Sequence, residues 1–158
     1  MFAPDDSDPP PTRWETVTSA DPTDAATNPT FVSAFMLLDA ETRSVASGAA
    51  KVAAALLDPV ERVERIVMGE TSGAPTMLVE TDVRLLVVTD RRPVPDIESF
   101  DASSGLHISG DTEADPASLT VTDHRRTITV DRIRDRVGAV AMAHGLTPGE
   151  QPGPDEQR

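Results

Sequence analysis

Cysteine is absent from this chain of 158 residues. Its absence excludes disulfide bonds, thiolate catalysis and zinc sites with cysteine ligands. The three histidines, His107, His124 and His144, lie far apart and lack the spacing of paired ligands, so we predict no metal and no other cofactor. Long apolar runs are missing too. The longest uncharged one, Val52 to Leu57, is much shorter than the about 20 residues that a membrane-spanning helix needs.

A signal peptide is not recognisable either. The first ten residues, MFAPDDSDPP, are acidic and rich in proline, and they contain neither a basic start nor the apolar run of a secretory signal. We therefore expect a cytoplasmic protein.

Positive charge is scarce throughout the chain. The net charge is −13, with 14 basic residues against 27 acidic ones. The deficit is spread over the arm, the middle and the tail, because residues 31–146 alone hold 12 bases and 18 acids. Nucleic acid is excluded as the main partner, since binding phosphate needs a concentrated positive surface. The acidity fits either a cationic protein partner or a simple requirement for solubility.

Residues 1–29 are predicted to be a disordered acidic arm. They carry six prolines and six acids against one base, and such a segment cannot bury enough apolar surface to offset its ordering entropy. The tail, residues 147–158, repeats this composition and is also predicted to be disordered. Within the arm, Trp14 is the only tryptophan of the chain and lies in the segment PTRWETV. It is either a docking motif that orders on binding or a residue that folds back over a surface patch.

Residues 30–57 are predicted to form one long amphipathic helix. Asn28 or Thr30 can cap the helix and Pro29 lies in its first turn, and Gly48 favours a break near residues 44–48. Apolar residues recur along one face at steps of three and four. Six of these residues define a candidate interaction surface: Phe31, Phe35, Leu38, Val45, Val52 and Leu56. The helix either covers the domain behind it or mediates self-association.

Residues 58–146 are predicted to form an antiparallel domain organised around Thr76 to Asp90. Asp58-Pro59 ends the helix, and short apolar runs separated by turn-formers follow it. The predicted strands are 62–68, 76–80, 84–89, 97–100, 106–109, 118–122 and 127–130, with a turn at 69–75 and a helix at 131–144. Helices do not alternate with strands, which excludes a parallel α/β fold. We predict an α+β fold: a seven-stranded antiparallel barrel or bent sheet capped by the C-terminal helix, preceded by the long N-terminal helix.

The segments LDPVERVERIVMG, TMLVETDVRLLVVTD and SLTVTDHRRTITVDRI, followed by an amphipathic helix, resemble the bacterial pleckstrin-homology-like (PH-like) domains. The resemblance covers roughly residues 57–146, and its most specific part is the hairpin motif from Thr81 to Leu86. It implies a seven-stranded barrel plugged by the last helix. It also implies a non-enzymatic scaffold for protein contact, oligomer assembly or occasionally lipid binding, without a shared catalytic set. The stiff segment Arg91 to Pro95 and the helix at 30–57 depart from the family pattern.

Chemical motifs are few. Asp111, Glu113 and Asp115 lack the glycine and the distal glutamate of a calcium loop, and neither a nucleophile elbow nor a glycine-rich phosphate loop occurs. The best candidate site is basic and comprises Arg84, Arg91, Arg92, Arg125 and Arg126. If their turns share one mouth of the barrel, the arginines could hold a phosphoinositide headgroup or an acidic peptide. Otherwise they pair with the acids that lie near them in the sequence.

From the sequence we therefore predict no catalytic residues and no enzyme, but an assembly or protein-interaction module whose partner is another protein or a second copy of the chain. The alternative is a membrane-surface adaptor that reads anionic lipid headgroups through the arginine-rich turns. A small hydrolase or isomerase inside a barrel is a third class, for which the sequence offers no placed acid and base.

Overall fold

The computed structural model describes residues 28–102 and 105–145. Residues 1–27, the Trp14 motif, positions 103 and 104 and the predicted tail lie outside the described residues. Asn28 is the N-cap of the first helix and Pro29 lies in its first turn, as the sequence predicted, so the boundary of the arm at residue 29 was placed two residues too late. The elements in chain order are α1 (Pro29–Met36), α2 (Ala40–Leu56), β1 (Val63–Thr71), β2 (Ala74–Thr81), β3 (Arg84–Thr89), β4 (Asp96–Asp101), β5 (His107–Ser109), β6 (Ala117–Thr122), β7 (Thr127–Ile133) and α3 (Arg136–Gly145).

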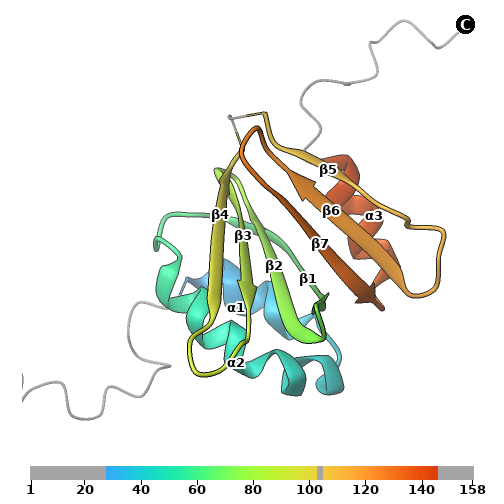
Figure 1. Ribbon diagram of the computed structural model, residues 1–158. Coiled ribbons are helices and arrows are strands. Elements are labelled where there is room, and N and C mark those ends of the chain that lie inside the picture. Colours follow the sequence, from blue (N-terminus) through green and yellow to red (C-terminus); the bar gives the residue numbers. More distant parts are fainter. Residues whose placement is uncertain (1–27, 103–104, 146–158) are drawn as a thin grey trace, which may run out of the picture.

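The strands form one seven-stranded sheet in the order β4-β3-β2-β1-β7-β6-β5, and every pairing is antiparallel. The predicted α+β class with seven antiparallel strands and a C-terminal helix is confirmed. The sheet bends into two halves, β1–β4 and β5–β7, which are joined by a single residue pair, Glu70 with Asp131. Figure 1 shows the two halves inclined to each other, with α1 and α2 beside the first half and α3 beside the second.

Two hydrophobic cores lie on opposite sides of β1–β3. The inner core fills the space between the two halves of the sheet and is closed by α3 through Ala139 and Met142. The helix-side core lies between the outer face of β1–β3 and helices α1 and α2. Neighbouring residues of β2 alternate between them: Leu78 belongs to the inner core, whereas Met77 and Val79 belong to the helix-side core. Burial on both faces explains why β2 and β3 are continuous apolar runs without polar alternation.

The N-terminal helical region differs from the prediction. Residues 30–57 form two helices, α1 and α2, with the break at residues 37–39 and not near Gly48. Asp39 caps α2 by accepting hydrogen bonds from the Thr42 backbone N–H (2.8 Å) and hydroxyl (2.7 Å). Arg43 fixes the corner because its guanidinium donates to the carbonyls of Met36 and Leu38, each at 3.0 Å. A strong capping residue therefore ends a periodic pattern that would otherwise continue through it.

Asn28 fastens α1 to the segment that leads into β1. Its amide donates to the carbonyls of Asp58 (2.9 Å) and Glu61 (2.5 Å), and its side-chain oxygen accepts from the backbone N–H of Thr30 (3.0 Å). The hydroxyl of Thr30 in turn accepts from the backbone N–H of Val63 at 2.8 Å. These buried bonds make the helices an integral part of the fold.

Two further boundaries differ from the prediction. The predicted turn at 69–75 is a two-residue reversal at Ser72 and Gly73, which have φ values of 50° and 79°. This backbone suits a tight antiparallel hairpin, so β1 and β2 extend further than the apolar runs alone indicated. The last helix begins at Arg136 and not at residue 131, because β7 continues to Ile133 and the side chain of Asp135 accepts from the Gly138 backbone N–H at 2.9 Å.

Candidate functional site

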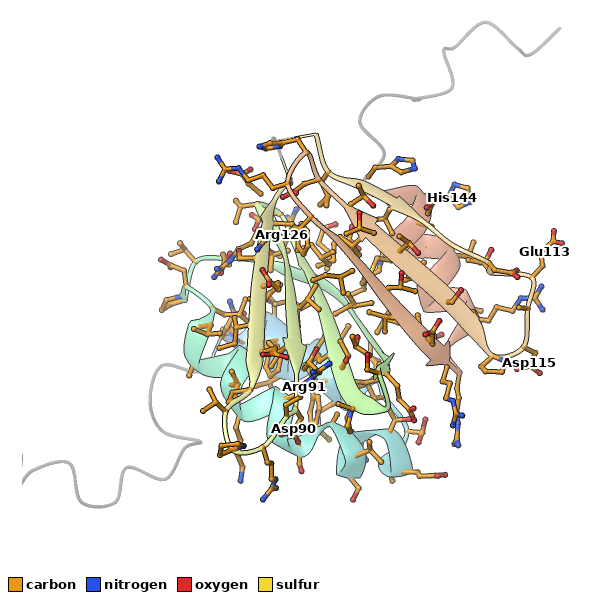
Figure 2. The ribbon with its side chains drawn as sticks, in the orientation of Figure 1. Asp90, Arg91, Glu113, Asp115, Arg126 and His144 are labelled. Atoms are coloured by element: carbon orange, nitrogen blue, oxygen red, sulfur yellow. The ribbon has the colours of Figure 1, made fainter. Side chains whose placement is uncertain are left out.

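The five arginines of the predicted basic site lie in different places. Arg84 begins β3 beside the β2–β3 turn, whereas Arg91 and Arg92 follow the other end of that strand. Arg125 and Arg126 lie in the β6–β7 turn. Figure 2 shows Arg126 toward one end of β4 and Arg91 toward the opposite end. Arg84 and Arg126 both contact Ser99 of β4, so they lie at one end of the sheet, whereas Arg91 and Arg92 lie at the other. The five arginines therefore do not share one basic mouth.

Arg84 is committed to an internal ion pair. Its Nε and Nη2 lie 2.7 Å and 2.9 Å from the two carboxylate oxygens of Glu61, and Nη2 also donates to the Leu56 carbonyl at 2.8 Å. The hydrogen bond from Arg84 holds the pKa of Glu61 below its ordinary value, and the same bond raises the pKa of Arg84. Glu61 is nearly buried, so this two-pronged pair ties the end of α2 to β3.

Arg126 is also held by its surroundings. Its guanidinium lies 4.3 Å from the centroid of the Phe100 ring and contacts the Glu98 carboxylate and the Ser99 carbonyl of β4. A cation over an aromatic face with a carboxylate beside it has little charge left to offer a ligand. This cluster links the β6–β7 turn to the other half of the sheet.

The remaining arginines are exposed. Arg91 Nε lies 3.1 Å from the Asp96 carboxylate in an exposed pair of the kind that contributes little to stability. Arg92 and Arg125 make no ion pair within the part of the chain that the structure describes. Because they lie on different loops at different ends, they do not supply a concentrated anion site.

The residues of the predicted interaction helix divide into two groups. Phe31 is buried, and Phe35, Leu38 and Val52 are half-buried against the helix-side core. Val45 and Leu56 remain exposed. The face of α2 that packs on the sheet consists mainly of small residues: Ala46, Ala49, Ala50 and Ala53. Most of the helical region therefore covers its own sheet, and only part of the predicted stripe is left for a partner.

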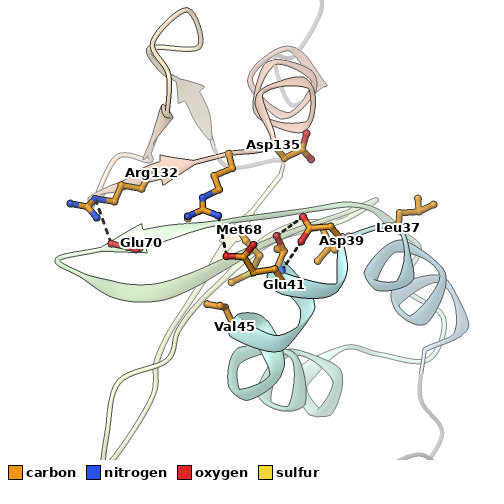
Figure 3. A pocket seen from close by; sticks show the side chains of 12 residues that line it. Leu37, Asp39, Glu41, Val45, Met68, Glu70, Arg132 and Asp135 are labelled. Carbon is orange, nitrogen blue, oxygen red and sulfur yellow. Dashed lines mark hydrogen bonds and ion pairs between the residues drawn. The ribbon is translucent and has the colours of Figure 1, made fainter.

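A pocket of about 500 Å³ opens where the α1–α2 corner meets β1 and the β7–α3 connection. Its apolar lining comes from Leu37 and Leu38 at the corner, Val45 on α2 and Met68 on β1. Leu37 is 87% exposed and Val45 is 54% exposed, whereas Met68 is buried and forms the floor. Figure 3 shows Val45 and Met68 beside Glu41, with Leu37 at the edge of the group beyond Asp39. Leu37 and Val45 thus place exposed apolar surface beside a concave opening, where a ligand could cover it.

Charged residues of both signs surround this pocket. Arg134 Nη1 lies 3.4 Å from Glu41 Oε1, and Arg132 Nε lies 3.8 Å from Glu70 Oε2. Both pairs are drawn as dashed lines in Figure 3, and both arginines are largely exposed. Exposed pairs of this kind exchange partners at little cost, so a bound peptide could take either member.

The backbone explains why a cavity exists at this point. Arg132 has a φ of 53°, in the left-handed region, and the register between β6 and β7 shifts beside it. The end of β7 therefore turns away from β1 after the single pair Glu70 with Asp131. The corner of the two helices stands on the other side, fixed by Asp39 and Arg43. The pocket lies between the end of β7 and the α1–α2 corner.

Sequence reasoning did not find this pocket as a unit. Leu38 and Val45 were among the predicted interaction residues, but Arg132, Arg134 and Asp135 fell within the helix that was predicted at 131–144. Their contribution depends on β7 extending to Ile133 and α3 beginning only at Arg136, which the apolar pattern did not reveal. The exposed leucine is separated from these residues by about 100 positions, so no local motif connects them.

A buried carboxylate lies at the end of the inner core under α3. The side chain of Glu80 is 3% exposed, and Arg65 Nη1 lies 3.0 Å from its Oε2. This contact lacks the alignment of a hydrogen bond, because Nη1 donates to the Ala141 carbonyl at 2.5 Å. Burial raises the pKa of Glu80, and the charge of Arg65 only partly offsets that effect. Arg65 thereby caps the C-terminal turn of α3 and balances the buried acid.

Neither a metal cluster nor a membrane helix is found in the described residues. No three or more acidic or histidine side chains gather there in an arrangement that could hold a metal ion, and this includes Asp111, Glu113 and Asp115. No helix among residues 28–102 and 105–145 has the length and apolar character needed to cross a membrane.

Comparisons of the chain with protein-family models, with curated proteins and with solved structures found no match.

Proposed function

We propose that this chain is a non-catalytic protein-interaction module with a PH-like arrangement, and that the pocket at the α1–α2 corner is its binding site. The seven antiparallel strands and the C-terminal helix that packs on them support this part of the proposal. The observation that carries the proposal is the pocket with its exposed Leu37 and Val45 beside the buried floor residue Met68. Apolar anchors in a concave site with a polar rim are typical of peptide and protein recognition.

The ligand expected from this lining is a short peptide segment with one apolar or aromatic anchor and a charge on either side. The anchor would cover Met68 and Val45, and its neighbours would meet the charges of Glu41 and Arg134. A segment that replaces one member of an exposed ion pair with another group of the same sign loses little electrostatic energy. Specificity therefore comes mainly from the shape of the apolar floor.

The proposal is tested by screening the full chain against a peptide library displayed on phage. Leu37→Glu places a charge in the pocket at a position that is almost fully exposed, so folding should be unaffected. Val94→Glu makes the same change at an exposed valine outside the pocket lining and serves as the control. A second screen uses the Trp14→Ala chain, so that the aromatic residue of the N-terminal arm cannot occupy the pocket in place of a library peptide.

We expect enriched peptides to bind with micromolar affinity and to lose about tenfold or more in affinity with Leu37→Glu, because a charged group would be desolvated at the anchor. The Val94→Glu chain should bind like the wild type. The function is rejected if neither the wild-type chain nor the Trp14→Ala chain enriches any peptide. It is also rejected if the enriched peptides bind the Leu37→Glu chain as tightly as the wild type.

The membrane-surface alternative has weaker support, because Arg84 and Arg126 are engaged inside the fold and Arg92 and Arg125 lie on different loops. Co-sedimentation with anionic vesicles at low and high salt separates the two functions. Salt-sensitive pelleting that is lost in an Arg92→Ala/Arg125→Ala chain would favour the adaptor.

A further inference from the structure

The pocket lies within reach of the chain's own N-terminal arm. Asn28, the first described residue, begins α1, and the pocket rim at Leu37 lies just beyond the other end of this eight-residue helix. At 1.5 Å per residue, α1 is about 12 Å long. Residues 15–27 connect Trp14 to Asn28. Random-coil statistics give a linker of this length an end-to-end distance of about 20 Å, which is enough to place Trp14 at the pocket.

The residues around Trp14 match the lining of the pocket. An indole is a large apolar group that would cover Val45 and Met68. Arg132 and Arg134 stand at the rim with exposed guanidinium groups that can stack on an aromatic face. Trp14 lies between Arg13 and Glu15, and the rim offers Glu41 and Glu70 to the base and the two arginines to the acid. The segment PTRWETV itself carries no net charge, because Arg13 and Glu15 balance each other.

We propose that the segment PTRWETV, residues 11–17, docks through Trp14 into the pocket of the same chain. The arm is then an intramolecular competitor for the peptide site. The inference rests on the proposed function in one respect, because it treats the pocket as a site for an extended peptide segment. It does not require that an external partner exists.

Because Trp14 is joined to the domain by a short linker, a weak contact with the pocket is enough to keep the arm docked for most of the time. A short flexible linker provides an effective concentration of about 1 mM, so an intrinsic dissociation constant of about 0.25 mM leaves the arm docked for about four-fifths of the time. Under the same values the tethered arm weakens the binding of an outside peptide by about fivefold. The regulatory effect is therefore moderate and is easily reversed by a partner of micromolar affinity.

The chain reports this contact directly, because Trp14 is its only tryptophan and tyrosine is absent. The measurement is the emission maximum and acrylamide quenching of the full chain, with a free peptide of residues 8–20 as the exposed reference. Val45→Glu and Leu37→Glu alter the pocket at exposed positions, and Val94→Glu is the control outside it. Circular dichroism and the unfolding midpoint verify that each variant keeps its fold.

We expect the quenching constant of the full chain to be about fivefold below that of the peptide, as an arm docked for four-fifths of the time requires. Val45→Glu and Leu37→Glu should each raise it to nearly the peptide value and shift the emission to longer wavelength. Val94→Glu should leave it low. The protection should not change on dilution, because the contact is within one chain.

Equal quenching of the chain and the peptide overturns the inference, and so does protection that both pocket variants leave intact. Protection that disappears on dilution, together with a light-scattering change from dimer to monomer, assigns the pocket to a second copy and also overturns it. The two proposals fail separately. An exposed Trp14 with library peptides still bound at the pocket refutes only the docked arm. A protected, pocket-dependent Trp14 with no library peptide bound by the Trp14→Ala chain refutes only the external partner.

Discussion

Two glutamates on neighbouring stretches of the chain experience opposite environments. Glu61 receives two charge-assisted hydrogen bonds from Arg84, so its ionised form is favoured in the folded state. Glu80 lies under α3 with only one unaligned guanidinium nearby, so its neutral form is favoured. The sequence around the two glutamates does not distinguish them, because other acidic residues lie near both. Their difference arises from burial and from the partner that the fold brings to each.

These opposite shifts give opposite contributions to the pH dependence of stability. Because Arg84 lowers the folded-state pKa of Glu61, Glu61 contributes stability above its ordinary pKa of 4.5 that is lost as the pH falls through the lower folded value. Because burial raises the folded-state pKa of Glu80, the chain loses stability as the pH rises from 4.5 through the higher folded value. Glu61→Gln should therefore flatten the loss of stability on acidification, and Glu80→Gln should flatten the loss above 4.5.

The measurement is urea unfolding followed by far-ultraviolet circular dichroism over a series of pH values. At neutral pH, Glu61→Gln should also cost about 2 kcal/mol, because it leaves the half-buried guanidinium of Arg84 without its counter-ion. Parallel stability curves for the wild type and both variants would show that neither carboxylate has a shifted pKa.

The roles of the arginines could not be assigned from the sequence. Arg84 and Glu61 are separated by 23 residues, and their contact depends on the reversal at the β2–β3 turn. Arg126 likewise meets Phe100 across the two halves of the sheet. Local sequence shows that acids are abundant near each arginine, but not which arginines turn inward. Among the five arginines of the predicted basic site, Arg91 with Asp96 and Arg126 with Asp123 are the ion pairs whose members are close enough in the sequence for a local argument.

At the scale of elements, the strands followed the apolar pattern more closely than the helices did. β3 matches its predicted range, and the other strands differ from theirs at one or both ends. The prediction of a single helix was wrong at Leu38 and Asp39. The apolar periodicity continues across the break, and only the capping residue Asp39 signals that a new helix begins. The packed face of α2 was also misjudged, since alanines carry little hydrophobic weight in a pattern but allow a helix to lie close to a sheet.

Arg65 of β1 adds a polar attachment to helix α3, which also packs on the inner core through Ala139 and Met142. Arg65→Ala removes the donor to the Ala141 carbonyl and leaves Glu80 buried beside no cation. We expect a loss of about 2 to 3 kcal/mol of unfolding free energy, together with faster hydrogen exchange of the amides in α3.

Arg62→Ala is the matched control, because Arg62 also pairs with a glutamate but is 68% exposed. It should cost less than about 0.5 kcal/mol and leave exchange in α3 unchanged. If both variants lose the same stability, or if α3 exchanges normally in Arg65→Ala, the helix is held by its apolar contacts alone.

At the scale of the whole molecule, the N-terminal helices and the bent sheet form one folding unit. Removal of residues 1–56 would uncover the outer face of β1–β3, which includes the buried residues Ile66, Met77, Val79, Leu86 and Val88. We expect the shortened chain to lose cooperative unfolding, to bind a hydrophobic dye and to aggregate. A chain beginning at residue 21 keeps both helices and Asn28, and it should unfold cooperatively near the temperature of the full chain.

Calorimetry and light scattering of both shortened chains provide the measurement. A stable, monomeric and cooperatively folded chain beginning at Leu57 would contradict this expectation and would make the two helices a separable attachment. The outcome also decides how oligomerisation can be studied, since deleting the helices cannot report on assembly if it destroys the fold.

The strands β1–β3 separate the inner core from the helix-side core by a single layer of backbone. Val67 faces the inner core and its neighbour Met68 faces the helices and forms the floor of the pocket, so both compartments share the same backbone. Close-packed interiors transmit displacements because they have little free volume to absorb them. We therefore expect a ligand that displaces Met68 to displace Val67 as well. Binding at the pocket would then change the packing of the inner core beneath α3.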